Sequence, residues 1–379
     1  MAQIDTKTEL PVWAEYGWID GGDPRHPGEG PRIRSKGFFL YVESNKLLDL
    51  DAYPEWSFDG SSTHQAPVSE SEVILRPEKV FRDPMKERRD PSSPVTVLVW
   101  CSTWTIHGEP HETNTRHELA QLMKENAAWD EEQDPLIGFE QEYTLVLRGN
   151  RMKSIIPEVH PNEEKEETEI SPEVRESLPE NFYAGYGSYH RWGRKIAEEH
   201  ARRCAQIGIL LWGVNAEVGP GQWEFQTRPN LPMDAADELW VARWILLRTA
   251  EDLEFDVRFH PKPFGKAFPG SGCHLNISTK DLRETPGFYE TAIEKIRTKF
   301  EEDPTACWKA YGAENELRLT GLHETAPLDT FISGVGHRGA SIRVPYSTQK
   351  KQRGYLEDRR PAANMDPYAG IRWMLSVFV

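Results

Sequence analysis

The segment Asn215–Gln226 constrains the fold and the chemistry of this chain most strongly. It reads Asn-Ala-Glu-Val-Gly-Pro-Gly-Gln-Trp-Glu-Phe-Gln, so a Gly-Pro-Gly turn signal separates two stretches that favour extended backbone. The pattern predicts two antiparallel strands joined by a tight loop, with Glu217 on the first strand and Glu224 on the second. Antiparallel pairing would place these carboxylates side by side, where like charges repel unless a cation neutralises them. We therefore expect the hairpin to form half of a metal site.

The composition limits the class of protein. The chain has 379 residues, of which 28% are charged and 11% aromatic, as is typical of a folded protein of one or two domains. Its net charge of −16 disfavours nucleic acid or an anionic membrane as the main partner. The four cysteines form no Cys-x-x-Cys pair, and no apolar run approaches the ~18 residues of a membrane-spanning helix. Together with a polar N-terminus that lacks a signal-peptide core, these features indicate a cytoplasmic protein.

The local patterns change near residue 108. Residues 1–108 alternate short β-rich runs with turns, which predicts a small β-rich domain. A capping-box pattern at Thr115–Glu118 predicts a helix with Thr115 as its N-cap, so a second domain would span 109–379. The acidic stretch 161–180 reads as an exposed loop, and the apolar residues 371–379 are expected to be buried and could form a subunit contact.

Two predicted strands in the second domain carry pairs of polar side chains. Leu136–Leu147 reads as a strand on which Glu140 and Glu142 share one face, because side chains alternate along a strand. Further on, a glycine-rich turn leads into a strand that carries His274 and Asn276 on one face. Amphipathic patterns predict helices at 192–206 and 235–250.

Six side chains are the candidate metal ligands: Glu140, Glu142, Glu217, Glu224, Glu357 and His274. Oxygen ligands with a single imidazole suit Mg²⁺ or Mn²⁺ better than zinc or copper, and five carboxylates could hold two ions. Several arginines lie near Glu357 in the sequence, and two divalent ions beside arginines would bind a nucleotide's phosphates. The chain contains neither a P-loop nor a His-Glu-x-x-His motif. The residues by themselves leave open a metal-dependent phosphoryl-transfer site or a hydrolase site.

The order of motifs along the chain resembles that of the eukaryotic-type glutamine synthetase family. Each motif alone is moderately specific, but a series of eight leaves little room for chance. The matching segments are 56–67, 138–145, 215–226, 261–263, 270–279, 318–325, 338–343 and 354–361. The resemblance implies an α+β fold, with a β-grasp N-terminal domain over 1–108. It also implies a catalytic domain over 109–379, in which helices surround a curved antiparallel sheet.

The resemblance further implies which residues form the site. Two or three Mg²⁺ or Mn²⁺ ions are expected, one held by Glu142, Glu217 and Glu224 and another by Glu140, His274 and Glu357. The residues expected to bind the amino acid or the transferring phosphoryl group are Arg318, Arg359 and Gly270. The expected catalytic residues are Asp59, Glu324, Arg338 and Tyr183. The expected ATP-binding residues are Asn276, Ser278, Arg283, Arg343 and Tyr355.

The activity implied is that of an ATP-dependent amide ligase, which condenses glutamate with ammonia through a γ-glutamyl phosphate to give glutamine. Asp59 would bind ammonium and take its proton, and Glu324 would close over the intermediate. In this family the domain of Asp59 serves the site of the neighbouring subunit. A homo-oligomer is therefore implied, with a decamer of two stacked pentameric rings as the expected form. The partners would be the amino acid, ammonia and ATP, with no nucleic acid and no membrane.

Several positions depart from the family pattern. Pro269 stands where an asparagine helps to position the amino group of the substrate, and proline has a fixed φ and no N–H. His337 also replaces an asparagine, and Leu136 stands where a tryptophan is common near the adenine. Trp212 occupies a usually small position, and we hypothesise that it restores this aromatic contact. The acidic stretch 161–180 is longer than usual.

The retained metal ligands argue against a non-catalytic relative. The changes keep open an alternative ligase of the same fold with a different acid or amine, such as a glutamate analogue or an amine that gives a γ-glutamylamide.

Overall fold

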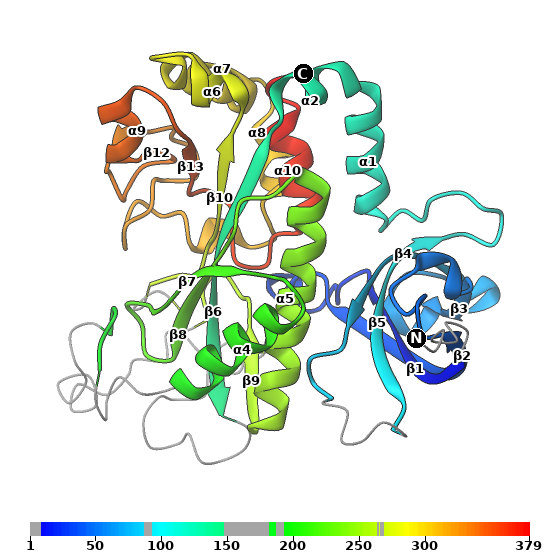
Figure 1. Ribbon diagram of the computed structural model, residues 1–379. Coiled ribbons are helices and arrows are strands. Elements are labelled where there is room, and N and C mark those ends of the chain that lie inside the picture. The colour runs from blue at the N-terminus through cyan, green and yellow to red at the C-terminus, as the bar shows by residue number, and fades with distance from the viewer. Residues whose placement is uncertain (1–8, 87–92, 148–181, 187–192, 264, 266–268) are drawn as a thin grey trace, which may run out of the picture.

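The computed structural model describes residues 9–86, 93–147, 182–186, 193–263, 265 and 269–379, and the stretch 161–180 therefore lies outside it. Within the described residues the strands form a five-stranded sheet from the N-terminal part and an eight-stranded sheet from the remainder, with helices between and around them (Figure 1). The expected α+β class is confirmed, whereas a domain boundary at 108/109 stays a prediction. No helix of this described part is both long enough and apolar enough to span a membrane.

The five-stranded sheet has the order β2–β1–β5–β4–β3, in which β1 and β5 are parallel and the other neighbours antiparallel. Its strands are β1 (Glu9–Ile19), β2 (Ile33–Glu43), β3 (Trp56–Asp59), β4 (Glu72–Arg82) and β5 (Val95–Trp104). On β5, Val97 and Val99 join the core of this sheet, while Leu98 and Trp100 join the larger core of the remainder. The two-residue period of a strand thus lets β5 serve both cores.

The eight-stranded sheet has the order β11–β12–β13–β10–β6–β8–β7, and β9 also pairs with β6. Its strands are β6 (Leu136–Leu147), β7 (Leu211–Ala216), β8 (Gln222–Thr227), β9 (Phe255–Arg258), β10 (Cys273–Ser278), β11 (Ser333–Val335), β12 (Ile342–Val344) and β13 (Leu356–Asp358). The strand predicted over Leu136–Leu147 is confirmed with these bounds. One face of β6 is buried through Phe139, Gln141 and Tyr143, so Glu140 and Glu142 line the opposite face.

Helices pack beside and around this sheet (Figure 1). They are α1 (Thr115–Glu125), α2 (Ala127–Gln133), α4 (Arg194–Gln206), α5 (Pro232–Asp252), α6 (Lys280–Glu284), α7 (Phe288–Glu302), α8 (Pro304–Ala310), α9 (Tyr346–Lys351) and α10 (Pro367–Leu375). Short 3-10 helices lie at Pro27–Glu29 (η1), Leu50–Ala52 (η2), Gly60–Thr63 (η3), Val68–Glu70 (η4) and Asn315–Leu317 (η6). Figure 1 shows α5 and α10 between the two sheets. The expected burial of residues 371–379 is confirmed in part, because Ile371 and Met374 are fully buried in the chain's own core, whereas Val379 is 44% exposed.

The helix predictions hold with shifted ends. The helix expected over 235–250 is α5, which begins with a proline in its first turn, and the helix expected over 192–206 is α4. Residue 192 lies outside the described residues.

The predicted cap of α1 is wrong. Asn114 is the N-cap, because its Oδ1 accepts the N–H of His117 at 3.0 Å. Thr115 is already helical, and its hydroxyl donates to Asp366, the N-cap of α10.

A buried ion pair joins the helical layer to the N-terminal sheet. Arg116 of α1 donates to both carboxylate oxygens of Asp237 in α5, at 3.0 and 3.1 Å, and also to Glu78 of β4. Tyr368 of α10 donates to the same Asp237. Asp237 is 1% exposed, so the loss of its carboxylate would leave two N–H groups of Arg116 and the hydroxyl of Tyr368 without their acceptor in a buried place.

We predict that Asp237→Ala lowers the free energy of unfolding by about 3 kcal/mol, as expected for breaking a buried ion pair from one side. Urea denaturation measures the change. Asp234→Ala on the same helix is the matched control, because its pair with Lys79 is partly exposed, and we expect a loss below about 1 kcal/mol there. Equal losses in the two variants would contradict this account of the joint.

Candidate functional site

Strand register collects the predicted acidic residues on one face of the eight-stranded sheet. Glu140 of β6 lies opposite His274 of β10 on one side, and Glu142 lies opposite Glu224 of β8 on the other. Glu357 of β13 lies opposite Asn276 of β10. Residues directly opposite each other point to the same face of a sheet. Four strands from distant parts of the sequence therefore present their polar side chains to one space.

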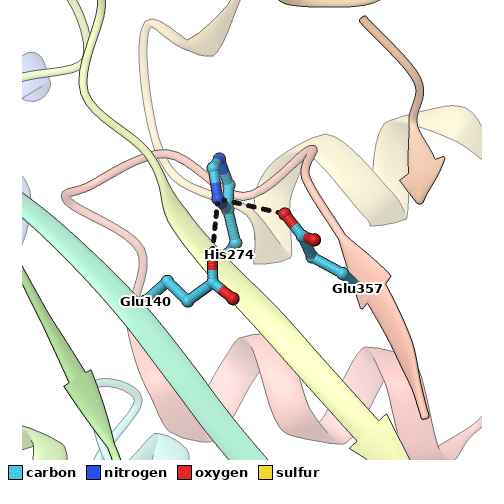
Figure 2. A group of neighbouring side chains, drawn as sticks. All are labelled: Glu140, His274 and Glu357. Atoms are coloured by element: carbon cyan, nitrogen blue, oxygen red, sulfur yellow. Dashed lines mark hydrogen bonds and ion pairs between the residues drawn. The ribbon is translucent and has the colours of Figure 1, made fainter. Parts of the chain in front are cut away.

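The first group consists of Glu140, His274 and Glu357. The Nδ1 atom of His274 lies 3.4 Å from Oε2 of Glu140 and 3.6 Å from Oε1 of Glu357 (Figure 2). Each residue offers one ligand atom, and these atoms lie within 4.8 Å of one another. Burial holds the pKa of His274 well below its usual value, so the imidazole is neutral and can donate a lone pair. Two carboxylates and one imidazole fit Mg²⁺ or Mn²⁺.

The second group consists of Glu142, Glu217 and Glu224. Burial, together with the charges of Glu140 and Glu142, raises the pKa of Glu224 to about 8. The pKa values of Glu142 and Glu217 are raised in the same way, first by burial and then by a neighbouring carboxylate of the group. Carboxylates that repel one another in a desolvated space are suited to a multivalent cation, which favours their charged form.

The hairpin that supplies Glu217 and Glu224 differs by one residue from the prediction. Strand β7 ends at Ala216, and Glu217 follows it, with its N–H donated to the carbonyl of Gln222. The placement of Glu217 on the first strand is therefore wrong. Asn215 lies opposite Glu224, so the two glutamates are diagonal neighbours. The side chain of Asn215 donates to Glu217 at 2.9 Å and orients it.

Two residues of this face were not identified from the sequence. Gln226 donates to Oε1 of Glu224 at 2.8 Å. Gln222 accepts the N–H of Gly219 at 2.9 Å and so fixes the turn. The signal was present, because Gln222, Glu224 and Gln226 alternate along β8 and so share its polar face.

Arginines surround the first group. Arg343 and Arg359 each contact a different oxygen of Glu357, at 2.7 and 2.5 Å. Arg359 also donates to the carbonyl of Arg338 at 2.9 Å. Arg338 in turn contacts Glu324 at 2.6 Å and lies 5.9 Å from the ring centre of Tyr183. The predicted catalytic side chains Arg338, Glu324 and Tyr183 are thus neighbours, and all three are half-exposed.

Arg318 is more buried than these arginines and packs against Gly270. Its Nη2 donates to the carbonyls of Arg359, Arg360 and Pro361 at 2.7 to 3.0 Å. Burial lowers the pKa of Arg318 to about 10. A Cβ at Gly270 would lie 2.5 Å from Cγ of Arg318, so only glycine allows this approach. An amino-acid carboxylate could bind here as a partner for the buried cation.

The predicted nucleotide-binding residues gather around the C-terminal end of β10. Asn276 donates to Oε1 of Glu140 at 3.0 Å, and its own Oδ1 is buried with no partner among the described residues. Ser278 donates to the carbonyl of Gly354 at 2.7 Å. Arg283 donates to the carbonyls of Ser278 and Asp134. A pocket at this end of the sheet is lined by Arg283, Ser347, Thr348, Lys351, Arg353, Gly354 and Tyr355.

Asp59 is separate from these groups. It ends β3 at the edge of the five-stranded sheet, on the opposite side of the molecule from β13 (Figure 1). Its carboxylate is exposed, and hydrogen bonds from Ser61 and Ser62 lower its pKa, so it is charged. Within one chain it does not meet the ligands listed above.

The departures from the family pattern lie around the site. The carbonyl of Pro269 accepts a hydrogen bond from Gln222 at 3.3 Å, and the preceding residues 266–268 lie outside the described part. His337 is exposed in the loop between β11 and β12. Leu136 begins β6 opposite Ser278. Trp212 lies in a bulge of β7 and is 68% exposed. Its contact with adenine stays a prediction.

We predict that the metal-free protein becomes less stable as pH rises from the ordinary glutamate value of 4.5 towards about 8. In this window folded Glu224 keeps a proton that the unfolded chain releases, so the folded state binds more protons and stability falls with rising pH. A saturating divalent cation removes the loss by stabilising the charged form. Melting temperatures at pH 6 and 8.5, with EDTA or with Mn²⁺, measure both effects. Glu224→Gln should weaken both effects, and an unchanged pH dependence in that variant would contradict the assignment.

Comparison with known proteins identifies the family. The family model described as "Glutamine synthetase, catalytic domain" matches residues 112–301. Glutamine synthetase N-1 of Phaseolus vulgaris is 42% identical over 357 residues, which cover 94% of this chain and 91% of that protein. Glutamine synthetase cytosolic isozyme 2 of Vitis vinifera is 41% identical over 359 residues, with coverage of 94% and 91%. A cryo-EM structure of Plasmodium falciparum glutamine synthetase has the same fold, with a TM-score of 0.71 at 16% identity over 96% of this chain and 71% of that chain. From the family match and from relatives so similar along nearly its whole length, the chain belongs to the glutamine synthetase family.

Proposed function

We propose that the protein is an ATP-dependent glutamate–ammonia ligase, which forms glutamine, ADP and phosphate. One observation carries the proposal. In a chain of this family, two groups of buried candidate metal ligands lie on one face of the sheet, next to the arginines and the predicted nucleotide-binding residues. The His274 Nε2 atom lies 3.9 Å from Oε1 of Glu142, so the two groups adjoin. The substrates are the amino acid, ammonia and ATP.

We assign two divalent ions, Mg²⁺ or Mn²⁺, to the two groups, and propose that a third can accompany the bound nucleotide. Bound ions supply Lewis-acid stabilisation of the charge on the transferring phosphoryl group. Arg359, which contacts Glu357, and Arg338, whose carbonyl accepts from Arg359, add positive charge to the site. Asn276, Ser278, Arg283, Arg343 and Tyr355 bind the nucleotide, and the unpartnered Oδ1 of Asn276 supports this role.

The reaction has two steps. An oxygen of the glutamate side-chain carboxylate attacks the γ-phosphorus of ATP, and the bond to ADP breaks. Ammonia then attacks the acyl carbon, and the C–O bond to phosphate breaks. Arg318 and Gly270 hold the α-carboxylate of the amino acid. Glu324, held by Arg338 beside Tyr183, closes the site, because water would otherwise hydrolyse the acyl phosphate.

Asp59 binds ammonium and takes a proton from it, because ammonium itself is not a nucleophile. Since Asp59 lies away from the metal ligands of its own chain, we assign it to the site of an adjacent subunit. A ring oligomer satisfies this arrangement, and we propose a decamer of two pentameric rings. The charged state of Asp59 and its exposed position support the assignment.

We also place the protein in the cytoplasm. The four cysteines are buried free thiols, as is usual in a reducing compartment. The relative from Vitis vinifera is named a cytosolic isozyme. A strongly acidic chain is a poor ligand for nucleic acid or anionic membranes, which leaves small molecules as its partners.

A second candidate is a ligase of the same fold that uses a different acid or amine. The feature that favours it is Pro269, which removes an N–H from the wall of the amino-acid pocket and presents a carbonyl to Gln222. His337 lies in the loop that also carries Arg338. Both changes touch the amino-acid side of the site and leave the metal ligands intact.

We predict that purified protein with Mg²⁺ and ATP releases phosphate and forms glutamine when glutamate and ammonium are both present. Phosphate release is measured across a panel of amino acids and amines, with amide formation followed by chromatography. Glu224→Ala should lose metal-dependent turnover by at least about a hundredfold, because it removes a ligand of the second group. Turnover only with another acid or amine would select the second candidate, and no turnover with any pair would contradict both.

Mixed oligomers test the shared site. Asp59→Ala and Glu357→Ala should each be inactive alone, but their co-expression should restore activity to about a quarter of that of wild type, the share of subunit junctions with both side chains intact in random mixing. Steady-state glutamine synthesis measures the recovery. The double variant co-expressed with Glu357→Ala is the control and should stay inactive. Failure of complementation in oligomers shown to be mixed would place Asp59 outside the neighbouring site.

A further inference from the structure

A hydrogen-bonded histidine–glutamate pair that neither metal group uses lies behind the amino-acid pocket. The Nε2 atom of His260 lies 3.1 Å from Oε2 of Glu314. His260 follows β9, and Glu314 precedes η6. Glu314 has a φ of +57°, a left-handed conformation that costs a residue with a side chain about 1 kcal/mol. Glycine would adopt this backbone conformation without that cost, so the glutamate side chain is present at a conformational expense.

The direction of this hydrogen bond is fixed by the neighbouring backbone. The Nδ1 atom of His260 accepts the N–H of Lys262 at 2.9 Å. A nitrogen that accepts carries no proton, so in the neutral ring the proton is on Nε2. Nε2 therefore donates to the Glu314 carboxylate. The imidazole thus ties the 260–262 backbone to the segment that begins at Glu314.

Both tied segments continue directly to the amino-acid pocket. On one side, the carbonyl of Pro261 accepts the N–H of Ser271 at 2.9 Å and would lie 2.5 Å from a Cβ at Gly270. On the other side, Asn315 accepts a hydrogen bond from Nε of Arg318 at 3.1 Å. The two segments meet where Arg318 packs against Gly270. A shift between them would change the position of the guanidinium.

Gly28, in the N-terminal part of the chain, packs against this pair. A Cβ at Gly28 would lie 2.2 Å from Oε2 of Glu314 and 2.5 Å from Nε2 of His260. The carbonyl of Gly28 accepts a hydrogen bond from Asn364 at 2.9 Å, which holds the turn in place. Gly28 has no side chain to displace the pair, and an alanine there would have to push it aside.

We propose that His260, Glu314 and Gly28 form a brace that positions Arg318 for the carboxylate of the amino-acid substrate. The inference rests on the proposed function, in which Arg318 binds that carboxylate. The three residues are positioning residues, since they act through Asn315 and Pro261. Because the pair is partly exposed, at 19% and 30% for the two side chains, its loss costs the whole fold little. Small displacements of a binding group nevertheless weaken binding strongly.

The test is the KM for glutamate in variants of the brace. Glu314→Ala and His260→Ala should raise it about tenfold, whereas kcat and the KM for ATP stay within about twofold. Glu314→Gln should retain near-normal KM, because its amide oxygen still accepts from Nε2. Gly28→Ala should raise the KM for glutamate similarly. Adding Gly28→Ala to the double variant His260→Ala/Glu314→Ala should raise the KM for glutamate no further, since both side chains that a Cβ at Gly28 would meet are then gone.

Matched controls are Glu316→Ala and His107→Ala, which remove the same side chains from exposed positions. A second readout does not depend on activity. Amide hydrogen exchange over residues 270–273 and 315–319 should become faster in Glu314→Ala and remain unchanged in Glu316→Ala and Glu314→Gln. Wild-type protein without glutamate turnover would contradict the proposed function, and the exchange measurement would still test the brace. Unchanged exchange, an unchanged KM for glutamate in an active enzyme, or parallel changes in both KM values would each overturn the brace.

Discussion

Repulsion among buried carboxylates is the constraint on which the rest of this structure depends. Glu357 is 1% and Glu224 is 6% exposed, and each faces further carboxylates on the same sheet face. Arg343 and Arg359 offset part of the charge at Glu357, whereas burial and mutual repulsion raise the pKa values in the second group. The fold therefore holds together a set of ligands whose charged form is costly until a cation binds. The rigid sheet prevents the groups from relaxing apart.

Strand β6 is central because it gives ligands to both groups. Glu140 faces β10 and Glu142 faces β8, so one strand sets the spacing between the two groups. The opposite side of β6 is packed through Phe139 and Tyr143 against the helical layer. A slip of one residue in this strand would turn both glutamates into the core. The hydrophobic residues thus fix the register that the chemistry requires.

Much of this arrangement could be predicted from local patterns. The two-residue period placed Glu140 with Glu142 and His274 with Asn276, and the resemblance to the family joined them. Other features depend on contacts that no local pattern encodes. Glu217 lies beyond its strand because β7 ends at Ala216. Asn114 caps α1, and the hydroxyl of Thr115 bonds to Asp366 instead. The separation of Asp59 from the metal ligands follows from how the two sheets pack, which the sequence of β3 does not reveal.

The contact between Asn364 and Gly28 spans 336 residues of sequence. Ribosomes release the N-terminal sheet long before Asn364 exists, and long-range contacts carry the largest entropic cost of closure. The turn at Gly28 therefore receives this hydrogen bond only after residue 364 has been synthesised. A chain that stops before Asn364 would contain all six predicted metal ligands and still lack the hydrogen bond that holds this turn beside His260 and Glu314.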